Sequence, residues 1–567
     1  MASRQAILDG LRTQPEVSVL IAGAGINGAG LFRDLALQGV DVLLVDKGDF
    51  CAGASSAPSR LIHGGLRYLE NGEFRLVAES LKERNLLLKN APHYVKPMPT
   101  TVPIFSWTSG IVNAALRFLR LSHKTTKRGA LIIKIGLTMY DLLARRYRSL
   151  PTHRFTGRAK ALEERPRLNP GIVCTATYYD AWVTHPERLC LELILDGEAL
   201  EPKAKALNYV SVSSASGDTV SLRDEVSGET FTVKPRVLVN ATGAWIDFTN
   251  RAVKRETHFI GGTKGSHLLI DHPELFAATR GQMLYFENTD GRICIFFPFH
   301  DKVLAGTTDI PVSDPETARC DEGEVDYILE SLRLVFPSIQ VDRSQIVYRY
   351  CGVRPLPTSD AVTPGQISRD HSFPILPPGN GVHFPIYSLV GGKWTTFRAF
   401  AEQVADHLLE HELKRSRVQS TEHLSIGGGS EYPLTLSERE KWLASMQEKT
   451  QLSRERLETL LDRYGTQAEQ VVFYETAYPD IPLRHHAGFS QREIAFIAEC
   501  ERVVHLDDLV LRRTLLALLG QLNRALLDEI AGIVAASLGW SLEATKAEVE
   551  RTLKLLEVDH GVQLASL

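Results

Sequence analysis

The feature that most constrains this chain is an apolar strand that runs directly into a glycine motif. The run Val17–Ala22 is followed by Gly23-Ala-Gly-Ile-Asn-Gly28, and the next apolar run, Val40–Val45, ends at Asp46. The first glycine permits a tight turn, the second lets the backbone approach a pyrophosphate, and the third lets helix and strand pack closely. The helix N-terminus then faces the phosphates, and Asp46 can accept hydrogen bonds from a ribose. This pattern predicts a β-α-β unit that binds a dinucleotide, with a helix over about residues 28–38.

The composition is that of an ordinary soluble globular protein. The 567 residues are 44% hydrophobic and 23% charged, which predicts about two to four domains with ample core. A net charge of −4 argues against a nucleic-acid partner. The seven cysteines are scattered, without a CxxC pair or Cys/His ligand spacing, so we expect reduced thiols and no metal site. The sequence shows no apolar leader and no run of about 18 apolar residues, which predicts an intracellular protein without a spanning helix.

Hydrophobic spacing divides the rest of the chain into regions. Residues 73–90 have helical spacing, whereas blocks at about 170–240 and 256–310 contain short β-rich runs, which predicts a mostly antiparallel sheet. Residues 414–433, with three glycines at Gly427–Gly429, are expected to form a linker. Beyond it the chain is almost purely helical, over Leu436–Lys449, Ser453–Tyr464, Gln491–Cys500, Leu506–Leu519, Leu522–Leu538 and Ser541–Leu556.

Three further motifs favour FAD over a nicotinamide dinucleotide. They are Leu61–Glu70 (LIHGGLRYLE), preceded by Ser55 and Ser56; Val237–Trp245 (VLVNATGAW); and Leu389–Thr396 (LVGGKWTT). Taken alone, the late glycine pair is as consistent with an ordinary turn. Together with the N-terminal motif it indicates a second contact to one long cofactor, whose adenine end lies on the β-α-β unit and whose flavin end lies elsewhere.

With these motifs in place, the chain resembles the FAD-dependent sn-glycerol-3-phosphate dehydrogenases of the respiratory, quinone-linked type. The resemblance covers nearly the whole chain, through Gly23–Gly30, Ser55–Glu70, Glu73–Val77, Ile135–Leu142, Lys264–His267, Gly306–Asp309, Gly352–Leu356, Ile367–Asp370, Gly391–Thr396 and Asp507–Thr514. Three features depart from the family pattern. Phe32 stands where a small residue usually packs helix on strand, residues 185–189 are less acidic, and the stretch 105–134 is longer than in short members.

The pattern and the resemblance together predict an α/β fold. A Rossmann-like FAD-binding domain is interleaved with an antiparallel-sheet substrate domain, and a C-terminal all-α domain follows. The expected oxidoreductase core spans 17–410, with FAD-binding parts at about 17–105, 195–250 and 350–410 and substrate parts at about 106–194 and 251–349. Residues 411–435 are the expected linker, and residues 436–567 form the expected helical domain.

The resemblance implies that the protein oxidises sn-glycerol 3-phosphate to glycerone phosphate and passes the electrons to a quinone. We expect it in the cytoplasm, attached peripherally to the inner face of the membrane, with a homodimer as one open option. The expected catalytic residues are His267 and Arg354, and the expected substrate-binding residues are Arg67, Tyr68, Lys393 and Arg369. FAD is expected to contact Gly23, Gly25, Ile26, Asn27, Gly28, Asp46, Lys47, Ser55, Ser56, His63, Gly64, Gly65, Ala241, Thr242, Gly243, Gly392, Lys393, Thr395 and Thr396.

The roles of the charged residues have competing interpretations. Arg67, Lys393 and Arg354 suit a phosphate clamp because guanidinium forks and ammonium groups bind phosphate, and the alternative for each is a solvated surface charge. His267 titrates near neutrality and is suited to take the hydroxyl proton; its alternative is a buried histidine at a strand start. Arg354 competes for this role, because a cation at the alcohol oxygen stabilises a developing alkoxide.

A basic segment predicts contact with a membrane surface. Residues 107–149 contain nine Lys or Arg against a single acid, Asp141. On a helical wheel the apolar residues of 111–119 share one arc, and the basic residues of 117–124 lie opposite. This arrangement fits an interfacial helix that is drawn to anionic lipid. A core-packed helix with a solvated basic side is the alternative.

Other functions stay open on the sequence alone. A related flavoprotein would oxidise another polyol phosphate, or would reduce oxygen as an oxidase. A member of a different class would be a non-enzymatic FAD-binding assembly or sensor protein. A purely NAD-dependent dehydrogenase is disfavoured by the Ala241–Gly243 and Gly391–Lys393 motifs.

Overall fold

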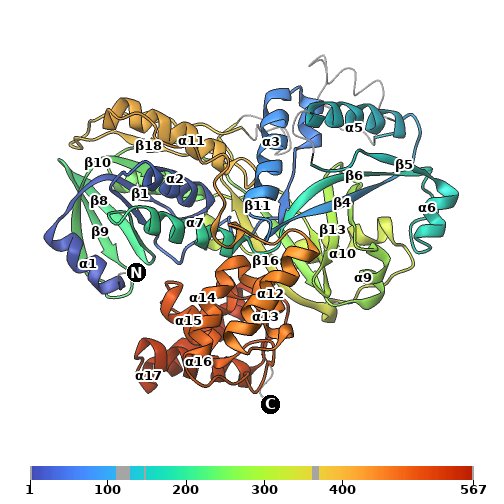
Figure 1. Cartoon of the computed structure of the whole chain (residues 1–567). Coiled ribbons are helices and arrows are strands. Elements are labelled where there is room, and N and C mark those ends of the chain that lie inside the picture. Colours follow the sequence, from blue (N-terminus) through green and yellow to red (C-terminus); the bar gives the residue numbers. More distant parts are fainter. Residues whose placement is uncertain (1–2, 110–127, 146–148, 360–369, 565–567) are drawn as a thin grey trace.

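The computed structural model describes residues 3–109, 128–145, 149–359 and 370–564. Two sheets stand side by side, and the helices of the last quarter of the chain pack below their junction (Figure 1). The short N-terminal helix α1 (Arg4–Thr13) lies at the outer side of the first sheet (Figure 1). No helix in the described ranges is long and apolar enough to cross a membrane.

An eight-stranded sheet carries the glycine fingerprint. Its central strands run parallel in the order β7-β2-β1-β10-β18, β17 pairs antiparallel with β18, and β8 and β9 extend from β10 as antiparallel strands. Alternate residues of β1 face two separate cores, because helices cover one face of the sheet and a second apolar cluster covers the other. The bounds are β1 (Glu16–Ala22), β2 (Val42–Val45), β7 (Lys205–Leu207), β8 (Val210–Ser216), β9 (Thr219–Asp224), β10 (Thr230–Asn240), β17 (Ile375–Leu376) and β18 (Ile386–Ser388).

The fingerprint helix is α2 (Ile26–Leu37), which begins slightly before the predicted Gly28. It packs against α7 (Pro186–Leu200) and α11 (Phe397–His407). Phe32, which departs from the family pattern, is fully buried in this contact. A Cβ on Gly197 of α7 would lie 2.6 Å from the Phe32 ring. The large ring is therefore accommodated by a glycine on the facing helix.

A ten-stranded sheet forms the second half of the core. Its main path is β15-β11-β14-β13-β12-β4-β6-β3, with β16 paired to β11 and β5 to β6. Every pairing is antiparallel except that of β4 with β12, as the β-rich blocks predict. The bounds are β3 (Leu61–Ile62), β4 (Val95–Ile104), β5 (Arg154–Gly157), β6 (Cys174–Val183), β11 (Thr263–Ile270), β12 (Met283–Glu287), β13 (Ile293–Phe299), β14 (Lys302–Gly306), β15 (Ile310–Pro311) and β16 (Ile346–Arg354).

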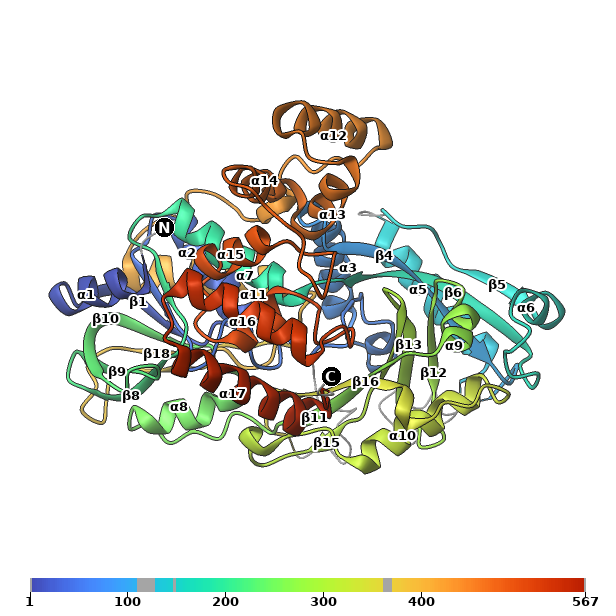
Figure 2. The ribbon, with the colours of Figure 1, turned by 90° about the horizontal axis from the view of Figure 1, so that it is seen from below.

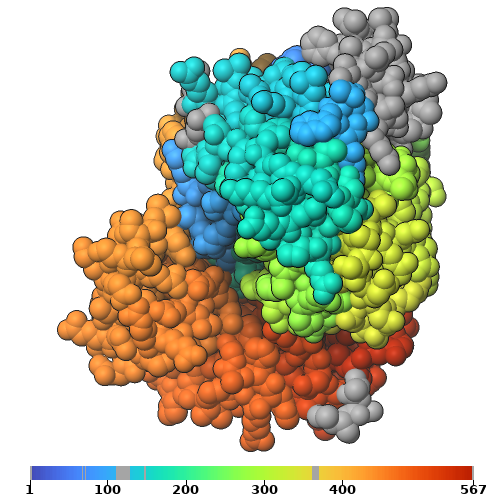
Figure 3. All heavy atoms as spheres, turned by 90° about the vertical axis from the view of Figure 1, so that its right-hand side faces the viewer, coloured from blue at the N-terminus to red at the C-terminus, as the bar shows by residue number. Residues whose placement is uncertain are grey.

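Five helices of the described residues pack around this second sheet. They are α3 (Phe74–Asn90), α5 (Ala130–Ala144), α6 (Arg158–Glu164), α9 (Pro273–Thr279) and α10 (Glu322–Val335), whereas α8 (Ile246–Ala252) follows β10 of the first sheet. Figure 3 shows this side of the molecule, where the residues near 150 and 330 stand above the C-terminal helices.

The chain crosses between the two sheets at residues other than the expected limits. Strands β3 and β4 fall in the stretch 17–105 expected for FAD binding, yet both join the ten-stranded sheet, because β4 pairs with β6 along its whole length. Conversely, α7 begins at Pro186, inside a stretch expected for the substrate domain, and packs on the fingerprint helix α2. Pairing between strands that are distant in sequence decides these domain limits. The local composition of a segment does not indicate which sheet it will join.

The C-terminal region is helical, as predicted, and shares a core with the second sheet. Its helices are α12 (Leu436–Thr450), α13 (Arg454–Tyr464), α14 (Ala468–Thr476), α15 (Gln491–Cys500), α16 (Arg524–Leu538) and α17 (Leu542–His560). Phe297 and Leu304 of the sheet belong to the same buried cluster as Leu509 and Leu526. Figure 2 shows α16 and α17 lying across the underside of both halves.

Two expectations for this region are wrong. The helix expected over Leu506–Leu519 begins at Leu506 but ends at Arg513 with a π-helical turn over Asp508–Arg513, and Thr514 is extended. The supposed linker is packed: a Cβ on Gly428 would lie 1.9 Å from the backbone oxygen of Tyr464, and one on Gly429 would lie 2.4 Å from that of Asn90. The glycines of this segment therefore allow close backbone packing. In the sequence, a run of glycines is equally consistent with such packing and with a flexible linker.

Candidate functional site

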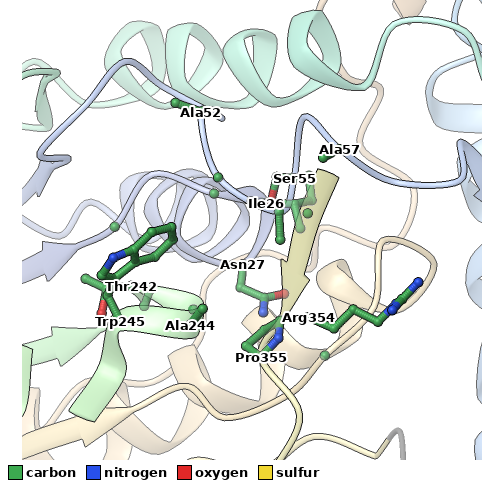
Figure 4. Close-up of a pocket in the computed structure, with 18 of the residues that line it drawn as sticks. Ile26, Asn27, Ala52, Ser55, Ala57, Thr242, Ala244, Trp245, Arg354 and Pro355 are labelled. Atoms are coloured by element: carbon green, nitrogen blue, oxygen red, sulfur yellow. Dashed lines mark hydrogen bonds between the residues drawn. The ribbon is translucent and has the colours of Figure 1, made fainter. Parts of the chain in front are cut away.

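A cavity of about 770 Å³ runs from the glycine fingerprint to the strands β11 and β16. Its size lies within the usual range of small-molecule and cofactor sites, about 300–1,000 Å³. Figure 4 shows Asn27, Ser55, Trp245 and Arg354 around this cavity, although they come from four separate segments. Of the residues expected at the site, the wall contains Gly23, Gly25, Ile26, Asn27, Asp46, Lys47, Ser55, His63, Tyr68, Ala241, Thr242, Gly243, His267, Arg354, Gly392, Lys393 and Thr395.

The fingerprint glycines allow two backbone segments to touch. Gly23 has a φ of +104°, and a Cβ there would lie 2.5 Å from the carbonyl oxygen of Ala241, just after the neighbouring strand β10. A Cβ on Gly28 would lie 1.9 Å from the carbonyl oxygen of Gly23. Gly25 caps α2, and the Ile26 N–H at the start of that helix donates to the Ser55 hydroxyl at 3.0 Å. The helix N-terminus therefore opens onto the cavity in the geometry that suits a pyrophosphate.

Asp46 stands at the carboxyl end of β2, where the fingerprint predicts a ribose contact. Its carboxylate accepts hydrogen bonds from Ala24 N at 2.6 Å and Gly48 N at 2.9 Å. Desolvation outweighs these two donors and raises the pKa of Asp46 to about 6. The ring of Trp245 lies 4.3 Å from Lys47 Nζ, and both side chains bond to Glu316. Glu316 was missed by the sequence reasoning, because it comes from the substrate half of the chain.

The late glycine pair touches the fingerprint helix directly. Asn27 Nδ2 donates to the Gly391 carbonyl oxygen at 3.2 Å, across 364 residues of sequence. Gly392 has a φ of +89°, and a Cβ there would lie 2.7 Å from the Asn27 side chain. Asn27 Oδ1 and Thr396 Oγ1 are buried without a hydrogen-bond partner among the described residues. The two motifs that predict one long cofactor therefore meet at one site, with polar atoms still to be satisfied.

The His63-Gly64-Gly65 turn is held from behind by a buried polar cluster. Gly64 N donates to Tyr140 Oη at 3.0 Å and to Asp180 Oδ1 at 3.2 Å, and Arg84 pairs with Asp180 at 2.9 Å. A Cβ on Gly64 would lie 2.4 Å from Tyr140 Oη. These three supporting residues were not predicted, because their contact with the turn depends on helices α3 and α5 and strand β6 coming together.

Lys393 and Tyr68 form the cationic part of the site. Lys393 Nζ donates to Ser80 Oγ at 2.7 Å and lies 4.6 Å from the centre of the Tyr68 ring. Gly65, with a φ of +78°, leaves room for that ring, because a Cβ there would lie 2.1 Å from it. The side chain of Arg67 and the whole of Arg369 lie outside the described residues.

His267 lies on β11, where it is buried and lines the cavity. Its Nε2 is 2.9 Å from Ser59 Oγ, its ring stacks on Tyr350 at 5.0 Å, and Nδ1 has no hydrogen-bond partner among the described residues. Burial, with the charges of Arg354 and Arg60, lowers the pKa of His267 to about 3. The imidazole is therefore uncharged at neutral pH.

Arg354 ends β16 and is oriented by the loop after β14. Its guanidinium donates to Asp309 at 3.0 Å, to Thr307 Oγ1 at 3.0 Å and to the Thr308 carbonyl at 3.1 Å. Thr308 Oγ1 in turn donates to the buried Glu324 at 2.5 Å. The Gly306–Asp309 motif belongs to the family pattern, but its function as a holder of Arg354 emerges only from the packing of β11 between β14 and β16.

Residues 18–406 match the family model of the FAD dependent oxidoreductases, and residues 419–545 match that of the C-terminal domain of alpha-glycerophosphate oxidase. A glycerol-3-phosphate dehydrogenase of Synechocystis sp. is 31% identical over 578 residues, covering 96% of this chain and 98% of the relative. The chain belongs to the FAD-dependent glycerol-3-phosphate dehydrogenase family.

Two further relatives are similar to the chain, one by sequence and one by structure. A D-erythritol 1-phosphate dehydrogenase of Brucella abortus is 30% identical, covering 88% of this chain and 95% of the relative. The crystal structure of a Bacillus halodurans glycerol-3-phosphate dehydrogenase has a TM-score of 0.74 and 23% identity, and the match covers 98% of this chain and 97% of that one. The predicted family, fold class and FAD cofactor are thus confirmed.

Proposed function

We propose that this protein uses FAD to oxidise sn-glycerol 3-phosphate to glycerone phosphate and passes the electrons to a quinone. The observation that carries the proposal is the meeting of Lys393, Tyr68, His267 and Arg354 on the wall of the one cavity that also contains the fingerprint. The Synechocystis relative, a glycerol-3-phosphate dehydrogenase, supports this substrate. FAD, when bound, supplies the acceptor for two electrons.

The cationic part of the site, formed by Lys393 and Tyr68, would bind the phosphate. The Lys393 ammonium group is a compact charge that suits phosphate oxygens, and the Tyr68 hydroxyl is a suitable donor beside it. The flanking Gly391 and Gly392 adopt φ values of +77° and +89°, so their backbone approaches the ligand without side chains in the way. These groups would fix the substrate by the end that does not react.

The reacting hydroxyl group would lie between His267 and Arg354. The uncharged His267 ring keeps Nε2 on Ser59 Oγ, and we assign this ring the role of receiving the hydroxyl proton. Arg354 carries a positive charge held in place by Asp309, which suits stabilisation of negative charge on the substrate oxygen. In this proposal His267 receives the hydroxyl proton and Arg354 stabilises the substrate oxygen.

Anaerobic mixing of the purified holoenzyme with sn-glycerol 3-phosphate tests the reaction. We expect the flavin absorption band to bleach, and to return when a quinone analogue is added. Bleaching by no polyol phosphate would reject an enzymatic role and favour an assembly or sensor protein. Peroxide formation in air at a rate matching quinone reduction would instead favour an oxidase.

The Brucella abortus relative supports a second candidate substrate, D-erythritol 1-phosphate. Both substrates carry a phosphate and a secondary alcohol, so the clamp and the proton acceptor described above serve either. A side-by-side comparison of flavin reduction rates at saturating concentrations separates them. Faster reduction by D-erythritol 1-phosphate would reverse our choice.

We also propose that the enzyme sits peripherally on the inner, cytoplasmic face of a membrane, where the quinone is found. The helix predicted within 111–124 lies outside the described residues. Nearby, however, α5 exposes Leu131 (49%), Ile135 (55%) and Leu142 (66%) at helical spacing, and Trp107 is 60% exposed. An apolar helix face with an adjacent tryptophan fits the boundary between lipid headgroups and acyl chains.

Co-sedimentation with anionic lipid vesicles tests the membrane proposal. We expect the double variant Ile135→Glu, Leu142→Glu to bind vesicles more weakly and to reduce a lipid-soluble quinone more slowly, with anaerobic flavin bleaching unchanged. Val418→Glu is the matched control, because Val418 is also apolar and 79% exposed but lies far from α5 in sequence. Equal vesicle binding by all three proteins would reject this surface.

A further inference from the structure

The loop of residues 46–55 forms one wall of the FAD cavity. Asp46, Lys47 and Gly48 line the cavity on one side of Asp49, and residues 52–55 line it on the other. Backbone hydrogen bonds tie the loop down, from Cys51 N to Ala24 O at 3.0 Å and from Ala52 N to Asp49 O at 3.2 Å. The shape of this wall therefore depends on where Asp49 is held.

The Asp49 side chain is held by the C-terminal region. Asp49 is 1% exposed. Arg513 donates to both of its carboxylate oxygens, at 2.6 and 2.8 Å, and Arg512 Nε donates to one of them at 2.5 Å. Asn208 Nδ2 completes the set at 3.0 Å. The two arginine contacts span 463 and 464 residues of sequence.

The two arginines are successive residues at the end of the π-helical turn Asp508–Arg513. Successive residues of an α-helix point about 100° apart. Here the wide turn ends at once, since Thr514 is extended, and both guanidinium groups reach one carboxylate. Wide turns of this kind often mark functional positions. The unexpected end of the helix at 514 is thus the feature that brings both arginines to the cofactor loop.

The positive charges of Arg512 and Arg513 are both buried, but Arg513 depends more on Asp49 than Arg512 does. Arg512 also pairs with Asp507 at 2.8 Å and with Asp508 at 2.6 Å. For Arg513, Asp49 is the acid in contact among the described residues, at 2.6 Å. Removing the Asp49 charge would leave the buried Arg513 cation without an acid in contact, which strongly destabilises the arrangement around it.

We propose that the C-terminal helical domain is a clamp for FAD, in which Arg512 and Arg513 hold Asp49 and so keep the loop 46–55 in its cofactor-binding shape. All three are positioning residues, since none of them lines the cavity. The proposal goes beyond the reaction proposed above and holds for any substrate. Because coupling between two sites is reciprocal, FAD binding also stabilises the turn 508–513.

The affinity of the full-length protein for FAD tests the clamp. Apoprotein is titrated with FAD and the binding followed by flavin fluorescence, without any substrate. We expect Asp49→Asn to raise the Kd for FAD by about tenfold or more, which is a typical coupling between sites. Arg513→Lys, which keeps the charge but loses the two-pronged contact, is expected to raise the Kd less.

Glu198→Gln is the matched control. Glu198 on α7 pairs with Arg502 at 2.7 Å, so the variant also breaks an ion pair to the C-terminal region, but Glu198 does not belong to the cofactor loop. Its Kd for FAD should stay within about twofold of wild type, as for sites that act independently. An unchanged Kd in Asp49→Asn, or an equal rise in Glu198→Gln, would overturn the proposal.

Hydrogen exchange on the wild-type protein keeps the test decisive if Asp49→Asn does not fold. Addition of FAD is expected to slow amide exchange in residues 506–514 more than in α12, which is remote from the loop. Exchange in 506–514 that is the same with and without FAD would also overturn the clamp.

Discussion

A methyl group at Gly265 tests whether the position of Arg354, in addition to its charge, drives the reaction. An ideal Cβ on Gly265 would lie 2.0 Å from Arg354 Nη2, 2.5 Å from Cζ and 2.6 Å from Nη1. Non-bonded atoms of this kind prefer about 3.5 Å, so the guanidinium of Gly265→Ala must move by more than about 1 Å. Such a shift breaks its contacts with Asp309 and Thr307.

The expected loss is larger for the rate than for the stability. A misplacement of about 1 Å costs a rate of the order of 10²-fold, and loss of one group that stabilises a developing oxyanion costs about 10²–10³-fold, or about 3–4 kcal/mol. The displaced atoms are the end of a flexible side chain that is 24% exposed. The unfolding free energy should therefore fall by only about 1–2 kcal/mol, the usual value of a lost charged hydrogen bond.

Stopped-flow measurement of anaerobic flavin reduction by sn-glycerol 3-phosphate gives the rate directly. Gly532→Ala is the control: Gly532 lies within α16, and a Cβ there meets nothing within 4 Å. That variant should reduce its flavin at the wild-type rate and gain about 1 kcal/mol from helix propensity. If Gly265→Ala also reduced its flavin within about twofold of wild type, the placement of Arg354 would not matter to the transition state.

Three further outcomes follow from the same geometry. Gly28→Ala should purify without flavin absorbance, because its Cβ would meet the Gly23 backbone at 1.9 Å; a yellow variant would contradict this. Tyr140→Phe should lower the unfolding free energy by about 1–3 kcal/mol and slow flavin reduction, since the Gly64 N–H loses a partner; an unchanged rate would contradict it. The pKa of His267 is lowered to about 3 from its ordinary 6.5, so its stabilising contribution is complete above pH 6.5 and is lost as the pH falls towards 3. His267→Gln should therefore flatten the acid side of the stability curve, and an identical curve would contradict the shift.

Much of the cofactor site was predictable because its residues are close in sequence. The strand, the three glycines and Asp46 lie within one β-α-β unit, and their spacing alone sets the turn and the helix start. The late glycine pair was expected to make a second contact to one cofactor, and in the structure Asn27 joins this pair to the fingerprint. The positions of Arg67 and Arg369 stay predictions, since neither the Arg67 side chain nor Arg369 is described.

The supporting residues escaped prediction for a physical reason. Glu324 orders the loop that holds Arg354, and Tyr140 with Asp180 holds the Gly64 turn. Each of these side chains is an ordinary polar residue in its own helix or strand. It gains a role only when another element is packed against it, and hydrophobic spacing contains no information about which polar residues will then face each other.

In the helical C-terminal region, too, local sequence predicted some features and tertiary contacts determined others. Its helices were predicted well where apolar spacing repeats, but the expected helix over 506–519 is interrupted after Arg513. The helix ends where Arg512 and Arg513 both contact one distant carboxylate, that of Asp49. Local propensity favours a continuous helix there, and a buried charge contact overrides it.

The sequence by itself determined the β-α-β unit, the FAD cofactor and the family, because glycines at fixed spacing enforce a local backbone path that few other residues permit. Only the tertiary structure decided that β4 joins the second sheet, that His267 is buried and uncharged, and that Asp49 is held by Arg513. Those properties depend on desolvation and on contacts between segments hundreds of residues apart. They exist only once the chain has closed around them.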